Sequence, residues 1–197
     1  DRTSNIVRLP CKLAITCETC GTPQQFVVWD TLNATLDPSL RAQLLDGKLT
    51  RFICEKCGWS TSVGYPLLYH DMGRKILIWL WPATSEPDVE QLASALKLMK
   101  GYQYRLVSSR NELVEKILIF EGGFDDRHIE IAKVFLRVKA GEDAHALKGE
   151  LFFNGVSRNR EGVESLFFEH VCEAGNESCS TPLSSHREVE KAIAHRL

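Results

Sequence analysis

The chain has 197 residues, a length that fits one domain with extensions or two small domains. Its formal net charge is −2, which argues against the non-specific nucleic-acid binding that basic residues drive. No apolar run approaches the ~20 residues of a membrane-spanning helix, and the first residues contain no apolar signal-peptide core. We therefore expect a cytoplasmic protein with reduced thiols and no membrane partner.

The first part of the chain predicts mostly β-structure, with four strands and one short helix. The strands are expected at 24–32, 50–54, 62–70 and 74–82, and the helix at 37–47. Asp37 is the predicted N-cap, Pro38 suits the first turn, and Gly47 is the predicted stop. Because the strands follow one another closely, an antiparallel sheet is favoured over βαβ units.

Two cysteine motifs of the same form bracket this segment. CETCG occupies residues 17–21 and CEKCG occupies residues 54–58. A C-x-x-C turn directs two thiolates at one metal ion about 2.3 Å away, so two such turns complete a tetrahedron. The glycine after each turn permits a positive φ. We therefore predict one four-sulfur metal site formed by Cys17, Cys20, Cys54 and Cys57.

The predicted metal is a single zinc ion with a structural role. All four ligand positions are filled, whereas catalytic zinc keeps one position open for water or substrate. Two alternatives remain: iron in a rubredoxin-like site, and a redox device built from the thiols. The distance between the motifs exceeds the usual ~15–20 residues, which the predicted strand and helix at 24–47 explain.

The second part of the chain predicts helices and then a β-hairpin. Helices are expected at 88–101, 113–121 and 126–139, the last two as an αα-hairpin, with a strand at 102–107. A second hairpin pairs 149–156 with 163–171, a polar loop fills 172–185, and a final helix closes the chain. Ser109 with Glu112 forms a predicted capping box, and Gly122–Gly123 a helix stop.

The predicted fold class is therefore α+β. It combines a zinc-ribbon-like antiparallel β-module containing a short helix with a helical hairpin and a C-terminal β-hairpin and helix. We predict a metal-binding domain over residues 1–139, made of the β-module at 12–82 and a helical part at 84–139. Residues 140–197 are predicted to form an extension.

The predicted order of elements is a cysteine knuckle (one C-x-x-C-G turn), strand, helix, strand, second knuckle and hairpin, followed by NELVEKILIFEGGFDDR at 111–127. In this order of elements and in this segment, the chain resembles the CpXC-domain proteins of bacteria and archaea. The resemblance covers roughly residues 12–138 and implies metal binding, with no reaction attached. Within the 111–127 segment, the resemblance implies that the residues belonging to the family pattern are Asn111, Glu112, Lys116, Glu121, Asp125, Asp126 and Arg127. The first knuckle departs from the family name, because Glu18 stands where proline is expected. Proline would stiffen the turn but would not bind the metal.

Other residues could carry chemistry, each with a plainer interpretation. Cys172 and Cys179 could form a second site with His170 or His186, although two free loop thiols fit the loose spacing better. Cys11 is interpreted as a spare thiol. His70–Asp71 is expected at a solvated turn, and Trp79 and Trp81 in the core. The acids of EGGFDDRH at 121–128 fit helix capping, with an anion or partner site at Arg127 or Arg110 as the alternative.

Three functions are compatible with these patterns. The favoured one is a zinc module that recognises a protein partner, since the site is closed and no catalytic motif stands out. A nucleic-acid-binding zinc ribbon is the second, but Glu18 and Glu55 partly balance the basic residues near the knuckles, which are Lys48, Arg51 and Lys56. The third is an enzyme with a site between the β-module and the 105–138 helices, lined by His70, Arg105, Glu112 or Arg127, and it leaves enzymatic activity open.

Overall fold

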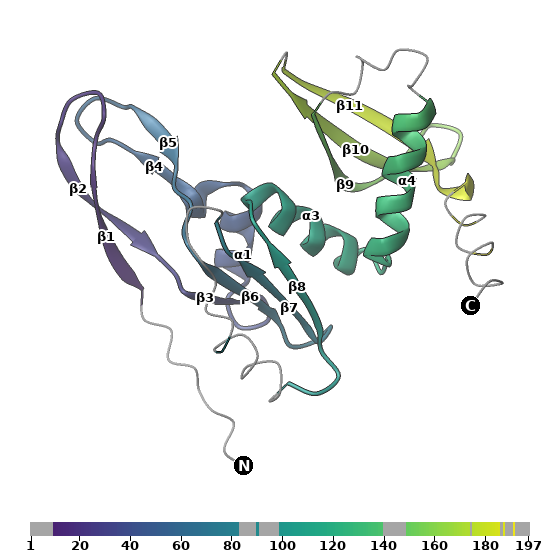
Figure 1. The fold of residues 1–197 in the computed structure, drawn as a ribbon, viewed down its shortest axis with the longest axis horizontal. Coiled ribbons are helices and arrows are strands. Elements are labelled where there is room, and N and C mark those ends of the chain that lie inside the picture. The colour runs from purple at the N-terminus through teal and green to yellow at the C-terminus, as the bar shows by residue number, and fades with distance from the viewer. Residues whose placement is uncertain are drawn as a thin grey trace. The chain divides into compact units, whose positions relative to one another are not determined.

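We describe the protein from a computed structural model, which places residues 10–82, 90, 99–139, 149–173, 175–185, 187 and 191. The chain forms two compact units, Asp1–Val114 and Glu115–Leu197, which are described separately. Both helices and antiparallel sheets are present (Figure 1), so the predicted α+β class is confirmed. Within the described residues, no helix is both long and apolar enough to cross a membrane.

Two short antiparallel hairpins form the ribbon part of the first unit (Figure 1). The first pairs β1 (Cys11–Thr16) with β2 (Pro23–Val28), and the second pairs β4 (Arg51–Ile53) with β5 (Ser60–Ser62). Each hairpin carries one of the two cysteine motifs at its turn. Strand β1 was not predicted, although Cys11, Leu13 and Ile15 alternate along it; most of its side chains are exposed, so this alternation does not mark a buried face.

A four-stranded sheet accompanies the ribbon in the same unit. Its order is β3 (Thr31–Asn33), β6 (Leu67–Asp71), β7 (Ile76–Leu80) and β8 (Gln103–Val107). The hairpin of β6 and β7 is antiparallel, as predicted, but β3–β6 and β7–β8 are parallel. The sheet is mixed because long stretches of chain separate the parallel partners: α1 and the second ribbon hairpin intervene between β3 and β6.

The predicted helix at 37–47 is confirmed as α1 (Pro38–Leu45), followed by a 3₁₀ turn, η1 (Lys48–Thr50). Proline stands in its first turn, and Gly47 ends it with a φ of 77°. Asp37 occupies the N-cap position but makes no capping hydrogen bond through its side chain. The predicted helix at 88–101 falls almost wholly outside the described residues.

The C-terminal end of α1 is held by a side chain from a distant part of the chain. Arg110 donates hydrogen bonds to the carbonyl oxygens of Leu44 (2.8 Å) and Leu45 (2.6 Å). Carbonyls in the last turn of a helix lack the usual i+4 partner, although that of Leu44 also accepts a hydrogen bond from the Gly47 amide (3.1 Å). A cation there also complements the helix dipole. Burial of the guanidinium lowers the pKa of Arg110. The arginine fork therefore ties α1 to the start of α3 (Arg110–Glu121).

Replacing Arg110 with alanine should lower the free energy of unfolding by about 2 kcal/mol, because the carbonyls of Leu44 and Leu45 lose a charged donor. Urea denaturation followed by circular dichroism measures this. Arg110→Lys is the matched variant and should recover part of the loss, since an ammonium keeps the charge without the planar fork. Equal stability of all three proteins would contradict the capping role.

The second unit packs helices against a three-stranded antiparallel sheet. The sheet order is β11 (Gly175–Pro182), β10 (Glu164–Cys172) and β9 (Glu150–Arg158). Helix α4 (Asp126–Lys139) crosses one face of this sheet (Figure 1). A single apolar cluster joins them, formed by Ile119, Ile129, Ala132, Leu151, Phe153, Leu166, Phe168 and Leu183.

Strand β11 corrects the prediction of a polar loop over 172–185. Residues 175–182 pair with β10 along their whole length, with Cys179 opposite Phe168. The segment reads as a loop because it is polar and largely exposed, and that composition is also what protects an edge strand from pairing with other chains. Residues 183–185 are helical, and most of the predicted final helix lies outside the described residues.

The two compact units meet at a different point in the chain from the predicted domain boundary. The predicted domains stay a prediction. The predicted boundary at 139/140 groups α4 with the metal-binding part, whereas the compact units group it with the strands that follow. The reason lies in the packing of α4, since Ile129 and Ala132 share one core with β9 and β10. The dividing point falls inside α3, so that helix contributes residues to both units.

Candidate metal centre

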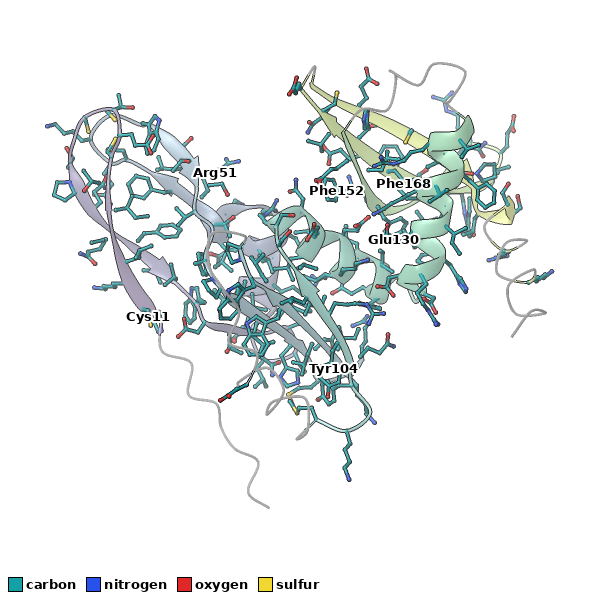
Figure 2. All side chains as sticks on the ribbon, viewed as in Figure 1. Cys11, Arg51, Tyr104, Glu130, Phe152 and Phe168 are labelled. Atoms are coloured by element: carbon teal, nitrogen blue, oxygen red, sulfur yellow. The ribbon has the colours of Figure 1, made fainter. Side chains whose placement is uncertain are left out.

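The four cysteines predicted to form one site do come together. Their sulfur atoms all lie within 4.8 Å of one another, near the turns of the two ribbon hairpins (Figure 2). The Sγ atoms of Cys17 and Cys57 are 3.6 Å apart, and so are those of Cys20 and Cys54. Four sulfurs placed tetrahedrally about 2.3 Å from a metal would be about 3.8 Å apart. This arrangement could therefore hold one metal ion.

The two knuckles have the same backbone hydrogen bonds. In the first, Gly21 N–H donates to the Cys17 carbonyl (2.9 Å) and Cys17 N–H to the Thr22 carbonyl (3.0 Å). In the second, Gly58 N–H donates to the Cys54 carbonyl (2.8 Å) and Cys54 N–H to Trp59 (2.7 Å). The φ angles of the two glycines are 67° and 74°, which residues with a side chain rarely adopt. The repeated C-x-x-C-G sequence thus produces one local shape twice.

The centre is buried on one side and open on the other. Cys17 and Cys54 are each 1% exposed and share a small core with Phe52, whereas Cys57 is exposed. The ring of Phe52 packs edge-on against those of Phe26 and Trp59, with centroids 6.2 Å apart in each case. Apolar packing therefore supports both hairpins on the buried side of the centre. Gln24 also accepts a hydrogen bond from the Glu55 amide (3.2 Å), which links one hairpin directly to the other.

The local hydrogen bonds make the four thiols unequal. Hydrogen bonds from the Thr22 hydroxyl and amide lower the pKa of Cys20 to about 6, and the hydroxyl oxygen lies 3.3 Å from its sulfur. At Cys57 the Trp59 amide also lowers the pKa, but partial desolvation and the three neighbouring cysteines outweigh it and raise the pKa to about 12. Thr22 was not singled out from the sequence; the signal was a hydroxyl two residues after a motif cysteine.

Comparison with known proteins agrees with this geometry. A family model described as CpXC protein matches residues 15–133, which include both knuckles and more than half of the chain. The chain belongs to the CpXC family. No curated protein matches this CpXC chain, and no solved structure matches it.

The acidic residues implied by the CpXC pattern make local contacts that order α3 and α4. Ser109 Oγ accepts a hydrogen bond from the Glu112 amide (3.2 Å), and Glu112 in turn accepts one from the Ser108 amide (2.7 Å). The capping box is thus present with its second bond shifted by one residue. Further along, Asp125 accepts a hydrogen bond from the Arg127 amide (2.9 Å) at the start of α4. These contacts agree with the capping interpretation of 121–128.

Lys116 and Asp126 belong to a charged cluster in the second unit. Lys116 Nζ lies 3.3 Å from Asp126 and 3.0 Å from Glu130, and Lys133 Nζ lies 2.6 Å from Glu115 and 3.2 Å from Glu130. Glu115 also accepts a hydrogen bond from the Phe153 amide (2.6 Å). The pairing of Glu115 with Lys133 could not be foreseen, because both residues lie on predicted helix surfaces far apart in sequence.

The Asp125–Arg127 contact predicts a measurable titration. The hydrogen bonds from Arg127 lower the pKa of Asp125 to about 2. A lowered folded pKa favours the folded state above the unfolded value near 3.9, and this stabilisation is lost as the pH falls toward 2. Arg127→Gln should move the Asp125 midpoint up toward its ordinary value. A carboxyl NMR titration tests this, and an unchanged midpoint would contradict the arginine as its cause.

The other cysteines do not share a site. Cys172 pairs with Gly175 across the hairpin, and Cys179 lies opposite Phe168, so about 13 Å of strand separates their positions. Cys179 packs against the apolar cluster of the second unit. Cys11 lies at the far end of β1 from the knuckles (Figure 2). His186 lies outside the described residues. Among the described residues, the four knuckle cysteines form the one grouping of this kind.

His70 and Asp71 correct the expectation of a solvated turn, because they are 7% and 4% exposed. His70 Nε2 lies 3.1 Å from the Tyr102 hydroxyl, and Asp71 accepts hydrogen bonds from the amide (2.9 Å) and guanidinium (3.0 Å) of Arg74. Strand β6 simply extends through them. Asp71 therefore stabilises the turn of the β6–β7 hairpin, and His70 links β6 to the residue before β8.

Two further residues named for a catalytic site also have local partners. Arg105 donates to the Tyr104 carbonyl (2.6 Å), and Arg127 is paired with Asp125.

Trp79 and Trp81 are half-buried, with their ring centroids 6.1 Å apart. Their packing suits a structural role, and the hypothesis of an enzyme stays a prediction.

Proposed function

We propose that this CpXC protein is a zinc-binding interaction module in which Cys17, Cys20, Cys54 and Cys57 hold one structural zinc ion. The proposal is carried by one observation, the convergence of four sulfurs from two hairpins on one point. A metal bound there would cross-link the two hairpins, and its binding free energy would contribute directly to the stability of the folded state. Four protein ligands leave no open position for a substrate.

Recognition of a protein partner is favoured over nucleic acid by the charge of the whole segment from the first hairpin to the second, α1 included. Between Cys11 and Ser62 the basic residues are Lys12, Arg41, Lys48, Arg51 and Lys56, and the acidic residues are Glu18, Asp30, Asp37, Asp46 and Glu55. These charges cancel. A zinc ion with four thiolates adds a charge of about −2, which a phosphate backbone would repel. The ribbon also leaves apolar side chains exposed at Leu13, Val27 and Ile53, which suits a protein surface.

Elemental mass spectrometry and an absorption spectrum of the purified protein test the metal. We expect one zinc per chain and no visible colour. One iron per chain with a red colour would contradict zinc and favour electron transfer. No metal, with the thiols oxidised in pairs, would contradict the metal centre itself. The seven free thiols support our further proposal of a reducing compartment such as the cytoplasm.

Binding to single- and double-stranded DNA and RNA at several salt concentrations tests the partner class. Nucleic-acid binding through phosphate contacts weakens steeply as the salt concentration rises, and we expect to observe no such binding. Strong salt-dependent binding, reduced by Arg51→Ala and Lys56→Ala, would overturn protein recognition in favour of the nucleic-acid ribbon. Lys100→Ala, outside the ribbon, is the matched control for a loss of overall charge.

A further inference from the structure

The second unit contains a cavity, whereas the metal centre belongs to the first unit. The cavity has a volume of about 440 Å³, a size typical of small-molecule sites. Its walls come from the end of β9, the start of β10 and the helical residues that follow β11. The β9–β10 hairpin and the segment after β11 therefore meet around one hollow.

Basic side chains dominate this cavity. Arg158, Arg187 and Lys191 line it, and Glu164 is the one acidic residue among its described lining residues. Their formal charges sum to +2, whereas the whole chain carries −2. A concave surface lined by one sign of charge concentrates ions of the opposite sign. The cavity is thus an electropositive site on a slightly acidic protein.

The internal ion pair leaves part of this charge available. Glu164 Oε1 lies 2.6 Å from Arg158 Nη2, so one carboxylate neutralises one arginine. The hydrogen bond from Arg158, with the charges of Arg158 and Arg187, lowers the pKa of Glu164. Arg187 and Lys191 are exposed at the rim, where their charges can act on an incoming ligand.

The cavity also has an apolar side. Val163 and Leu183 line it beside the cations, and Leu183 is buried in the core of the unit. A ligand that fits would carry a compact negative charge on an organic body. Arginine forks match the oxygens of phosphate, and a phosphate monoester carries close to the −2 charge that complements the lining.

We propose that this cavity binds a small molecule that carries a phosphate monoester, with Arg187 and Lys191 holding the phosphate and Val163 contacting the organic part. A volume of about 440 Å³ is enough to hold a small phosphate ester. The site is independent of the metal centre and of the proposed zinc function.

Phosphate titration followed by amide NMR tests the proposal on the full metal-loaded chain. Inorganic phosphate should shift the Gly162, Val163 and Ser184 amides in a saturable way at constant ionic strength. Phenyl phosphate should bind several-fold more tightly than inorganic phosphate, because the apolar wall contacts its ring. Arg187→Ala and Lys191→Ala should each raise the Kd about tenfold or more, since each removes a charge-assisted hydrogen bond.

Arg160→Ala is the matched control, because Arg160 lies in the same β9–β10 turn but does not line the cavity. It should leave the Kd within about twofold if contact, rather than overall charge, decides binding. Equal weakening by all three variants, or shifts that sodium chloride alone reproduces, would overturn the site. Tighter binding of an acidic peptide through Arg187 and Lys191 would overturn the assignment to a small phosphate ester. Circular dichroism confirms that each variant is folded.

Discussion

Cys54→Ser is expected to abolish metal binding and to unfold the ribbon, the largest effect that we predict for a single substitution. Cys54 is 1% exposed, its sulfur lies 3.6 Å from that of Cys20, and it is one of the four sulfurs of the cluster. A serine hydroxyl is a poor replacement for a thiolate, and structural zinc contributes about 10–16 kcal/mol in small zinc domains. The metal content should fall from one ion per chain to near zero, and amides of β4 and β5 should lose protection from hydrogen exchange.

Cys11→Ser is the matched control, because Cys11 is an exposed thiol on the same ribbon but outside the cluster. It should keep the full metal content and the protection of both hairpins. A Cys54→Ser protein that retains one tightly bound metal and a folded ribbon would contradict the four-sulfur centre. So would a Cys11→Ser protein that loses its metal as completely.

Lys133→Met is expected to lower the free energy of unfolding of the second unit by roughly 3–5 kcal/mol. The Lys133 ammonium lies 2.6 Å from Glu115, and the two side chains are 11% and 3% exposed. Without the lysine, the Glu115 carboxylate stays buried with less compensation. Burial already raises the pKa of Glu115, so protonation favours the folded state and acidification should restore part of the stability.

Urea denaturation and hydrogen exchange at the Phe153 amide, which donates to Glu115, measure this effect. The double variant Glu115→Gln with Lys133→Met should recover most of the stability, since a neutral amide can still accept that hydrogen bond. Lys48→Ala breaks an exposed ion pair with Asp46 and should cost at most about 1 kcal/mol. Similar losses for Lys133→Met and Lys48→Ala would contradict the importance of burial.

Local signals in the sequence predicted several elements well. Proline and glycine bounded α1, Ser109 and Glu112 marked the start of α3, and the apolar run at 76–80 became the buried strand β7. Strand β11 was missed because its exposed, polar residues give no apolar pattern, and β1 was missed although its apolar residues alternate. The parallel pairing of β3 with β6 was missed because sequence patterns carry no information on which distant strands meet.

The candidate site was predictable to a greater extent than the fold. A motif that repeats with its glycine fixes the same turn twice, so the sequence identified the four cysteines that the fold brings together. The contact of Thr22 with Cys20 depends on a side-chain rotamer, and the basic cavity depends on packing between β9, β10 and the residues after β11. Neither follows from spacing along the chain.

The placement of one knuckle on each hairpin has a consequence for the order of folding. Each pair of cysteines is close in sequence and can form within its own hairpin, whereas Cys20 and Cys54 are 34 residues apart. Closing that loop costs chain entropy, so the half-sites should form early and the complete tetrahedron late. Once the site is complete, the metal would act as a cross-link between the two hairpins. Like a disulfide, such a cross-link limits the conformational freedom of the unfolded chain, but it does not require an oxidising environment.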